Sequence, residues 1–131
     1  MLSRKSNKKS GTEFETVFRK LLRENGFWSH KLVENENGAP FDIIAIKNGQ
    51  AYAFDCKECS SDRFPLNRVE DNQITGMRKI QEAGARAYFV FSYQNEMYVT
   101  LANHIFSLIK SGEKSTKVID YRPLKEWLPC H

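Results

Sequence analysis

An Asn-Gly dipeptide between two apolar runs is the feature that most restricts how this chain folds. Residues 41–46 (FDIIAI) and 51–56 (AYAFDC) are strand-like, and Asn48-Gly49 lies at the centre of the short segment between them. Asn-Gly in such a place is the strongest short-range signal for a β-hairpin, because both residues tolerate the positive φ of a type I′ turn. Both runs are apolar on both faces, so the hairpin is predicted to lie inside a sheet rather than at its edge.

The rest of the chain supplies helices and further strands around this hairpin. Apolar residues from Phe14 to Leu22 follow one helical face, and Asn25-Gly26 ends that segment. The other predicted strands are 27–33, 86–92 and 96–101, and the predicted helices are 11–24, 67–83 and a short one around 105–109. Residues 111–131 are harder to interpret, with 118–121 as a candidate strand. This order predicts an α/β fold with a central mixed β-sheet flanked by α-helices.

The positive charge of the chain is concentrated at its beginning. Twenty Lys and Arg against 16 Asp and Glu give a net charge of +4. The first ten residues contain four basic residues and no acid: Arg4, Lys5, Lys8 and Lys9. We therefore expect a basic flexible arm over 1–10 that contacts phosphate, or a merely solvated terminus, before a single domain over 11–131. No apolar run approaches the roughly 20 residues that a bilayer requires, so a soluble, cytoplasmic protein is expected.

The hairpin brings two carboxylates together. If Asn48 and Gly49 form the turn, Asp42 lies opposite Asp55, with β-carbons roughly 4.5–5.5 Å apart. Lys57 follows two residues after Asp55 and projects from the same face. Taken singly, Asp42 could be a turn residue and Asp55 with Lys57 a solvated ion pair. Their conjunction on buried strands instead indicates a divalent cation, because Mg²⁺ prefers carboxylate oxygens and repelling charges inside a sheet are costly.

These residues form a pattern, Pro40-x-Asp42 followed by Asp55-x-Lys57, that resembles the PD-(D/E)XK nuclease superfamily. Further segments in the same order are similar to RecU-type Holliday junction resolvases: Gly11-x-x-Phe14-Glu15, Phe64-Pro65-Leu66, Gln73 and Gly112-x-Lys114-Ser115. The likeness covers residues 10–116. It implies a restriction-endonuclease-like fold and a homodimer.

The resemblance also implies roles for individual residues. Asp42 and Asp55 would ligate Mg²⁺, with Mn²⁺ as a substitute, and Glu15 would complete or support the metal shell. Lys57 would orient the attacking water or stabilise charge on the phosphorane, with Gln73 at the edge of the site. Two of these residues have competing interpretations, because Thr12-x-x-Glu15 is a capping box and Gln73 could equally be an exposed helix residue.

The resulting functional prediction is a metal-dependent DNA endonuclease that resolves Holliday junctions in DNA recombination and repair. Arg63 and Arg68 are candidate phosphate contacts beside the basic arm, although arginine on a surface also serves solubility. RecU proteins carry a stalk insertion where this chain has only the loop 34–40, as in compact archaeal-type resolvases. The alternatives are a nuclease of this fold with another DNA substrate, of restriction or defence type, and a non-catalytic DNA-binding module.

Overall fold

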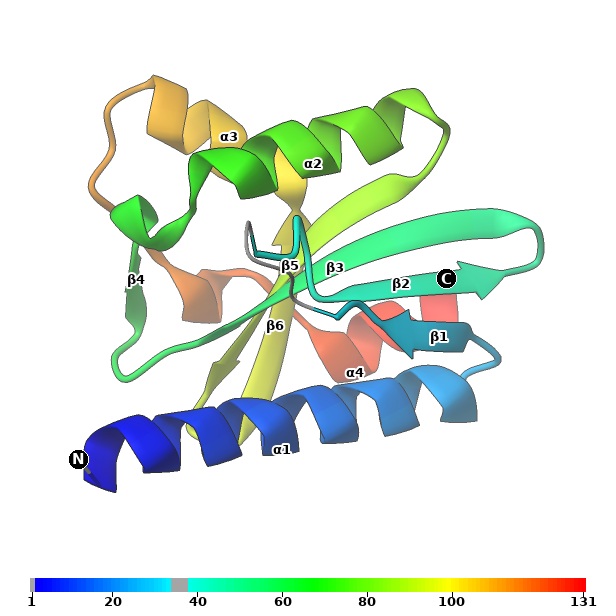
Figure 1. The fold of residues 1–131 in the computed structure, drawn as a ribbon, viewed down its shortest axis with the longest axis horizontal. Helices are drawn as coiled ribbons and strands as arrows, with labels where there is room; N and C mark the ends of the chain where they lie inside the picture. The colour runs from blue at the N-terminus through cyan, green and yellow to red at the C-terminus, as the bar shows by residue number, and fades with distance from the viewer. Residues whose placement is uncertain (1, 34–37) are drawn as a thin grey trace.

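The computed structural model describes residues 2–33 and 38–131, which form a mixed sheet between two layers of helices (Figure 1). The strands are β1 (Trp28–Lys31), β2 (Ile43–Lys47), β3 (Gln50–Glu58), β4 (Arg63–Pro65), β5 (Arg86–Tyr93), β6 (Glu96–Leu101), β7 (Ser115–Lys117) and β8 (Arg122–Pro123). The helices are α1 (Leu2–Glu24), α2 (Asp71–Glu82), α3 (Ala102–Lys110) and α4 (Leu124–Trp127). Short 3₁₀ turns are η1 (Leu66–Arg68), η2 (Val118–Asp120) and η3 (Leu128–Cys130).

The main sheet of the described residues has the strand order β1-β2-β3-β5-β6-β8. Its two central strands, β3 and β5, are parallel, and every other neighbouring pair is antiparallel. The connection between the parallel strands passes through β4, η1 and α2, and β4 pairs with β7 in a separate two-stranded sheet. The predicted mixed sheet is therefore confirmed, and β2 and β3 are interior strands as the apolar pattern predicted.

The β2–β3 hairpin has the predicted register. Lys47 pairs with Gln50 across the turn, and Ile43 pairs with Phe54 at the other end of the ladder. Asn48 and Gly49 have φ values of 50° and 78°, which is the left-handed backbone that a type I′ turn requires at both central positions. The turn chemistry and the hydrophobic pattern thus select the same register, and this fixes which residues of β3 face each side of the sheet.

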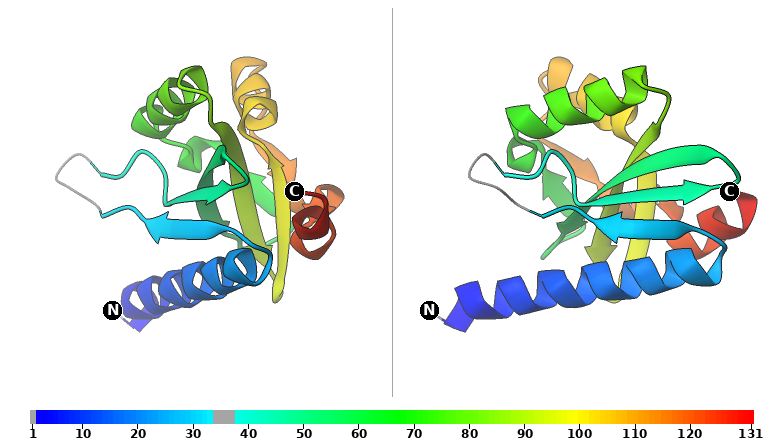
Figure 2. Two further views of the ribbon diagram at one scale, coloured as in Figure 1. Left: turned by 90° about the vertical axis from the view of Figure 1, so that its right-hand side faces the viewer. Right: turned by 45° about the vertical axis from the view of Figure 1, so that its right-hand side comes forward.

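Each face of the sheet carries its own hydrophobic core. The two further views in Figure 2 show helices on both faces of the sheet. On one face Phe18 of α1 and Trp127 of α4 enclose Phe54. On the other face α2 and α3 cover alternate strand residues, with Met77 and Phe106 in the same cluster as Phe89. Trp127 and its neighbours therefore anchor the end of the chain to the domain.

The first helix is longer than the sequence pattern predicted. It begins at Leu2 rather than near Gly11, so it includes the segment expected to be a flexible arm. Residues 2–10 contain no proline, and lysine and arginine are good helix formers, so a helix can continue through them. A glycine inside the helix, Gly11, costs about 1 kcal/mol relative to alanine without ending it.

Two other boundaries also differ from the prediction. The second helix begins at Asp71 instead of Asn67, because the chain first makes the separate turn η1. The candidate strand at 118–121 is instead the turn η2, followed by β8 and α4. Val118 is fully buried there, so apolarity in this segment reflects core packing and not a strand ladder.

Candidate active site

Asp42 lies one residue before β2 begins, and its backbone already joins the strand ladder. Its N–H donates to the Phe54 carbonyl at 3.0 Å, and its own carbonyl accepts from the Leu32 N–H at 2.8 Å. The side-chain Oδ2 accepts a 2.7 Å hydrogen bond from the backbone N–H of Cys56. The carboxylate therefore reaches across the hairpin to the residue next to Asp55, in agreement with the predicted register.

Asp55 is fully buried on the side of the sheet that α2 covers. Burial raises the pKa of its carboxyl from 3.8 to about 7; the Lys57 ammonium opposes this shift and the nearby Asp42 charge adds to it. Its Oδ1 accepts a 3.2 Å hydrogen bond from the Gln73 amide. Its Oδ2 lies 3.0 Å from Lys57 Nζ in an ion pair.

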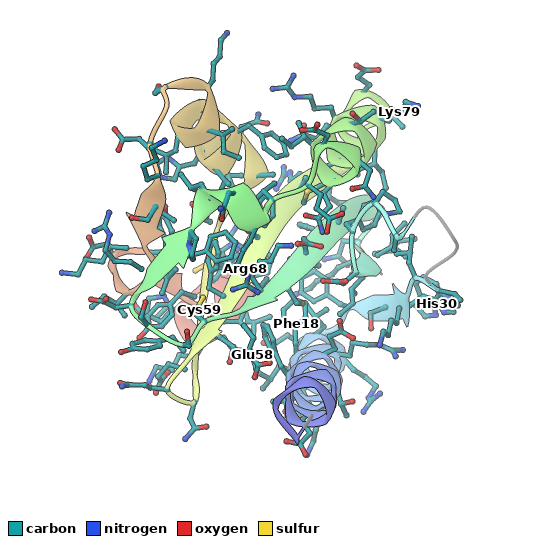
Figure 3. The ribbon with its side chains drawn as sticks, turned by 60° about the vertical axis from the view of Figure 1, so that its left-hand side comes forward. Phe18, His30, Glu58, Cys59, Arg68 and Lys79 are labelled. Carbon is teal, nitrogen blue, oxygen red and sulfur yellow. The ribbon has the colours of Figure 1, made fainter. Side chains whose placement is uncertain are left out.

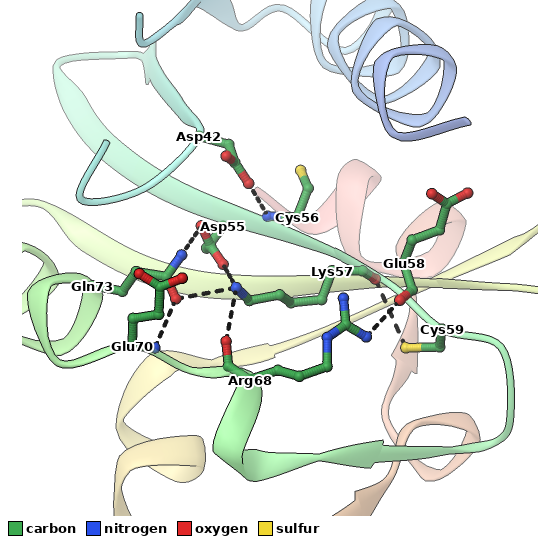
Figure 4. Close-up of polar contacts among 9 residues, drawn as sticks. All are labelled: Asp42, Asp55, Cys56, Lys57, Glu58, Cys59, Arg68, Glu70 and Gln73. Atoms are coloured by element: carbon green, nitrogen blue, oxygen red, sulfur yellow. Dashed lines mark hydrogen bonds and ion pairs between the residues drawn. The ribbon is translucent and has the colours of Figure 1, made fainter. Parts of the chain in front are cut away.

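Lys57 and Gln73 complete a connected polar group around Asp55 (Figure 4). Lys57 Nζ lies 3.1 Å from Gln73 Oε1 and 3.5 Å from the Arg68 carbonyl, in addition to its ion pair with Asp55. Because an ammonium only donates, the Gln73 oxygen must face Lys57 and its amide nitrogen must face Asp55. Gln73 therefore bridges the Asp55 carboxyl and the Lys57 ammonium.

The start of α2 explains why Gln73 occupies this place. Glu70 precedes the helix in an extended conformation, and its N–H donates to Gln73 Oε1 at 3.1 Å. This is the returning half of a capping box, in which the third helical residue satisfies a backbone donor before the first turn. Of the two interpretations of Gln73, the structure favours a place beside Asp55 over an exposed helix position.

The carboxylate pair fits a divalent cation. Burial and the neighbouring Asp42 charge both disfavour an ionised Asp55, and the Lys57 ammonium beside Oδ2 offsets only part of this effect. Mg²⁺ and Mn²⁺ both accept carboxylate oxygens, and Mg²⁺ commonly uses only one or two of them, with water and phosphate completing its shell. Asp42 and Asp55 are accordingly the residues that would hold the ion.

Glu15, the third predicted ligand, makes a different contact in this structure. Its Oε1 lies 2.6 Å from Lys31 Nζ of β1, and its side chain is 17% exposed. Thr12 lies inside α1 and not at its start, so it does not have the N-cap position that the alternative capping box requires. Within residues 2–33 and 38–131, no three Asp, Glu, His or Cys side chains lie close enough to form a metal cluster. The role of Glu15 as a ligand stays a prediction.

The two predicted arginine contacts are partly engaged within the protein. Arg63 Nε donates to Ser115 Oγ at 2.8 Å, which joins β4 to β7. Arg68 Nη1 donates to the Glu58 carbonyl at 2.9 Å, and its guanidinium lies 5.1 Å from the centre of the Phe64 ring. Both side chains are exposed, and Figure 3 shows Arg68 near Glu58, the last residue of β3. Their contact with DNA stays a prediction.

The four basic residues at the start of the chain, Arg4, Lys5, Lys8 and Lys9, belong to α1, and their side chains lie outside the described part of the structure. The active-site residues lie between the α1 layer and η1 in Figure 4.

None of the described helices has the length and apolar character needed to cross a bilayer.

Two backbone groups at the site had no signal in the sequence. The Cys56 N–H holds Asp42, and the Arg68 carbonyl accepts from Lys57. A backbone donor or acceptor is present at almost every residue, so no residue type marks where one is used. The predicted strand register brings the Cys56 N–H near Asp42, but the hydrogen bond itself is visible only in the structure.

The fold and the site together define a class of protein. A mixed sheet covered by helices on both faces, with two carboxylates and a lysine at the hairpin, is the restriction-endonuclease-like architecture of PD-(D/E)XK nucleases. The solved structure of Archaeoglobus fulgidus Hjc, a Holliday junction resolvase, shares this fold with a TM-score of 0.68 and 16% identity. The superposition covers 90% of this chain and 99% of that one.

The sequence comparisons then identify the family. The model of the family Recombination protein U (RecU) matches residues 29–128, and the chain belongs to this family. It is also 25% identical over 89 residues to the crossover junction endodeoxyribonuclease Hjc of Methanocaldococcus jannaschii. That match covers 68% of this chain and 63% of the length of the relative. The predicted resemblance to RecU-type resolvases is thus confirmed. The match extends beyond residue 116, where the predicted likeness ended, but it begins at residue 29 and so does not include the predicted segment from Gly11 to Glu15.

Proposed function

We propose that this chain is a metal-dependent endonuclease that hydrolyses phosphodiester bonds of DNA at four-way junctions. Membership of the RecU family and the names of the two Hjc proteins support this assignment. The sequence has only residues 34–40 where RecU proteins carry a stalk, and this short length supports a compact resolvase of the archaeal type; residues 34–37 lie outside the described part of the structure. A role in DNA recombination and repair follows from that substrate, and the cytoplasmic location expected from the sequence stays a prediction.

The observation that carries the proposal is the environment of Asp55. A fully buried carboxylate beside a second carboxylate is unfavourable because of its burial and because of the repulsion between the two charges. Lys57, 3.0 Å from Asp55 Oδ2, offsets only part of this. A divalent cation would remove both costs at once. A module that only binds DNA has no chemical need for this pair together with Lys57, so the arrangement supports an enzyme over the non-catalytic alternative.

The residues around the site supply the parts that phosphodiester hydrolysis needs. A cation held by Asp42 and Asp55 would lower the pKa of the attacking water and neutralise phosphate oxygens. Lys57 would place a fixed positive charge where negative charge develops on the phosphorane, and electrostatic preorganisation of this kind is often the largest contribution to catalysis. Gln73 would hold the Lys57 ammonium in place and keep one oxygen of Asp55 oriented away from it.

Binding to the junction would rest on contacts with the sugar–phosphate backbone of the DNA. The basic residues of the first half of α1 and the exposed Arg63 and Arg68 are the candidate phosphate contacts. Symmetric cuts in two opposed strands require two active sites related by a two-fold axis, so we propose that the chain acts as a homodimer.

Cleavage of a labelled four-way junction tests the proposal. The junction is incubated beside linear duplex and single strand of the same sequence, with Mg²⁺, with Mn²⁺ and with EDTA. We expect paired nicks only in the junction and only with metal. Lys57→Ala should lower the cleavage rate by at least about 100-fold, typical for loss of one group that stabilises transition-state charge.

The other outcomes separate the alternatives. Cutting of all three substrates would retain the nuclease and reject the junction assignment in favour of another DNA substrate. Binding of the junction without any cut by the wild-type protein would favour the non-catalytic module. Metal-dependent cutting that survives in Lys57→Ala would reject the role given to Lys57.

A further inference from the structure

A glycine in the interior of α2 lacks the usual reasons for glycine. Gly76 is the sixth residue of a 12-residue helix, where glycine is among the least favourable residues. Gly26, Gly38, Gly49, Gly84 and Gly112 have positive φ, whereas Gly76 does not. Backbone conformation therefore gives no reason for glycine at this position.

The reason is the close approach of another segment. A β-carbon built on Gly76 would overlap the β-carbon of Pro40 and would lie 3.3 Å from the Pro40 α-carbon. The obstructing atoms belong to a rigid ring and its backbone, so they cannot move aside as the end of a long side chain could. Among the glycines whose surroundings are described, Gly49, Gly84 and Gly112 have nothing within 4 Å of a β-carbon.

Pro40 leads directly into the metal site. Phe41 is buried in the core under α2 and α3, and Asp42 follows it into the ladder with Phe54 and Leu32. The position of Pro40 on α2 therefore constrains where the Asp42 backbone enters β2.

The same helix face also contacts Asp55. Gln73 precedes Gly76 by three residues, a spacing that places both on one side of a helix. Gln73 donates to Asp55, and Gly76 lies against Pro40 next to Asp42. One face of α2 thus contacts Asp55 directly and also contacts Pro40, two residues before Asp42.

We propose that Gly76 is a positioning residue that sets the separation of Asp42 and Asp55 by allowing α2 to rest on Pro40. The inference rests on the proposed function, since the carboxylate pair is assigned there to a divalent cation. A side chain at position 76 would push the helix and the 38–42 segment apart. Asp42 would then move relative to Cys56 and Asp55, and the pair would bind the cation more weakly.

The test compares Gly76→Ala with two double variants. Pro40→Gly removes the obstructing β-carbon, whereas Pro40→Ala retains it, and both remove the proline ring. The single variants Pro40→Gly and Pro40→Ala report the effect of the loop change alone. Thr75→Ala, at an exposed position of the same helix, controls for a new alanine in α2.

Two measurements are made on each full-length variant without DNA. Binding of Mn²⁺ alone is followed by electron paramagnetic resonance of the free ion. Hydrogen exchange of the Cys56 N–H in metal-free protein reports on its hydrogen bond to Asp42. We expect Gly76→Ala to bind Mn²⁺ at least tenfold more weakly and to exchange the Cys56 amide at least tenfold faster, at unchanged overall helicity.

Rescue decides between positioning and a general packing defect. Gly76→Ala with Pro40→Gly should regain both wild-type values, and Gly76→Ala with Pro40→Ala should not. Wild-type behaviour of Gly76→Ala, or the same behaviour of the two double variants, would overturn the proposal. If Gly76→Ala alone does not fold, the double variants give the same comparison. If wild-type protein binds no Mn²⁺, the proposed function fails, while the Cys56 exchange rates still decide the role of Gly76.

Discussion

Asp55 is a buried carboxyl whose ionised form destabilises the metal-free fold but is the form that would bind a cation. Its pKa is raised to about 7, so in the metal-free protein the carboxyl keeps its proton below about pH 7, whereas a metal ligand must be ionised. Lys57 compensates only part of the cost, because burial outweighs its attraction. Near pH 7, Asp55 is therefore close to its pKa, and binding of a cation would shift it to the ionised form.

The stability of the metal-free protein should consequently fall as the pH rises. The folded state keeps its proton up to about pH 7, whereas the unfolded carboxyl loses it near 3.8, so the native state binds more protons between these values. Asp55 alone should lower the free energy of unfolding by up to about 1.4 kcal/mol per pH unit in that range. Urea unfolding in EDTA from pH 4.5 to 8 measures this slope.

Asp55→Asn provides the matched variant for that measurement. An amide has no proton to lose, so the slope assigned to Asp55 should disappear and the metal-free variant should be the more stable protein at pH 8. Added Mg²⁺ should stabilise the wild type and leave Asp55→Asn unchanged. An identical pH slope in the two proteins would show that Asp55 is ionised in the fold.

At the scale of elements, two glycines outside the carboxylate pair serve opposite purposes in building it. Gly49 provides a positive φ in an open turn, with nothing within 4 Å of a β-carbon, and so fixes the register of β2 on β3. Gly76 provides space in a tightly packed helix. The first determines which residues face each other, and the second determines how closely α2 approaches the hairpin entrance.

Gly49→Ala should therefore destabilise the protein without impairing the site. An alanine in the left-handed region costs about 1–2 kcal/mol, and no steric clash adds to it. We expect the free energy of unfolding to fall by that amount in urea, with junction cleavage within about twofold of wild type at a temperature where both are folded. Gly49→Asn is the control, and its loss should be smaller because asparagine tolerates this conformation. Loss of cleavage in a folded Gly49→Ala protein would contradict the separation of the two roles.

At the scale of the whole molecule, the two cores hold the sheet from both faces, and the carboxylate pair lies where the entrance to β2 meets the middle of β3. The short elements at the end of the chain belong to this arrangement, since Trp127 makes ring contacts with Phe27, Phe54 and Tyr88. The basic first half of α1 extends from the same domain as one continuous helix.

Replacing Arg4, Lys5, Lys8 and Lys9 with glutamine tests whether this helix contacts DNA. Loss of phosphate contacts should weaken junction binding and flatten its dependence on salt by about 0.9 in the log–log slope per contact. Binding titrations at several salt concentrations give that slope. Glutamine at Lys79 and Lys125, which are exposed on α2 and α4, is the control for general charge loss. An unchanged slope in the first variant would show that the basic segment does not contact DNA.

The sequence by itself determined the hairpin, its register and the carboxylate pair. These features depend on neighbouring residues only, since the Asn-Gly turn sets the register and the period of a strand then places Asp42, Asp55 and Lys57. The same local spacing carried the resemblance to RecU-type resolvases that the family match confirmed.

Only the tertiary structure decided the contacts between segments that are distant in the chain. Gln73 had two equal interpretations until the position of α2 placed its amide between Asp55 and Lys57. Glu15 met Lys31 across a helix–strand contact that no periodicity encodes. The glycine at position 76 has meaning only once Pro40 lies against it. Local sequence patterns predict the secondary structure of each segment. The separation between segments depends on how the two cores pack, and this packing involves residues from the whole chain.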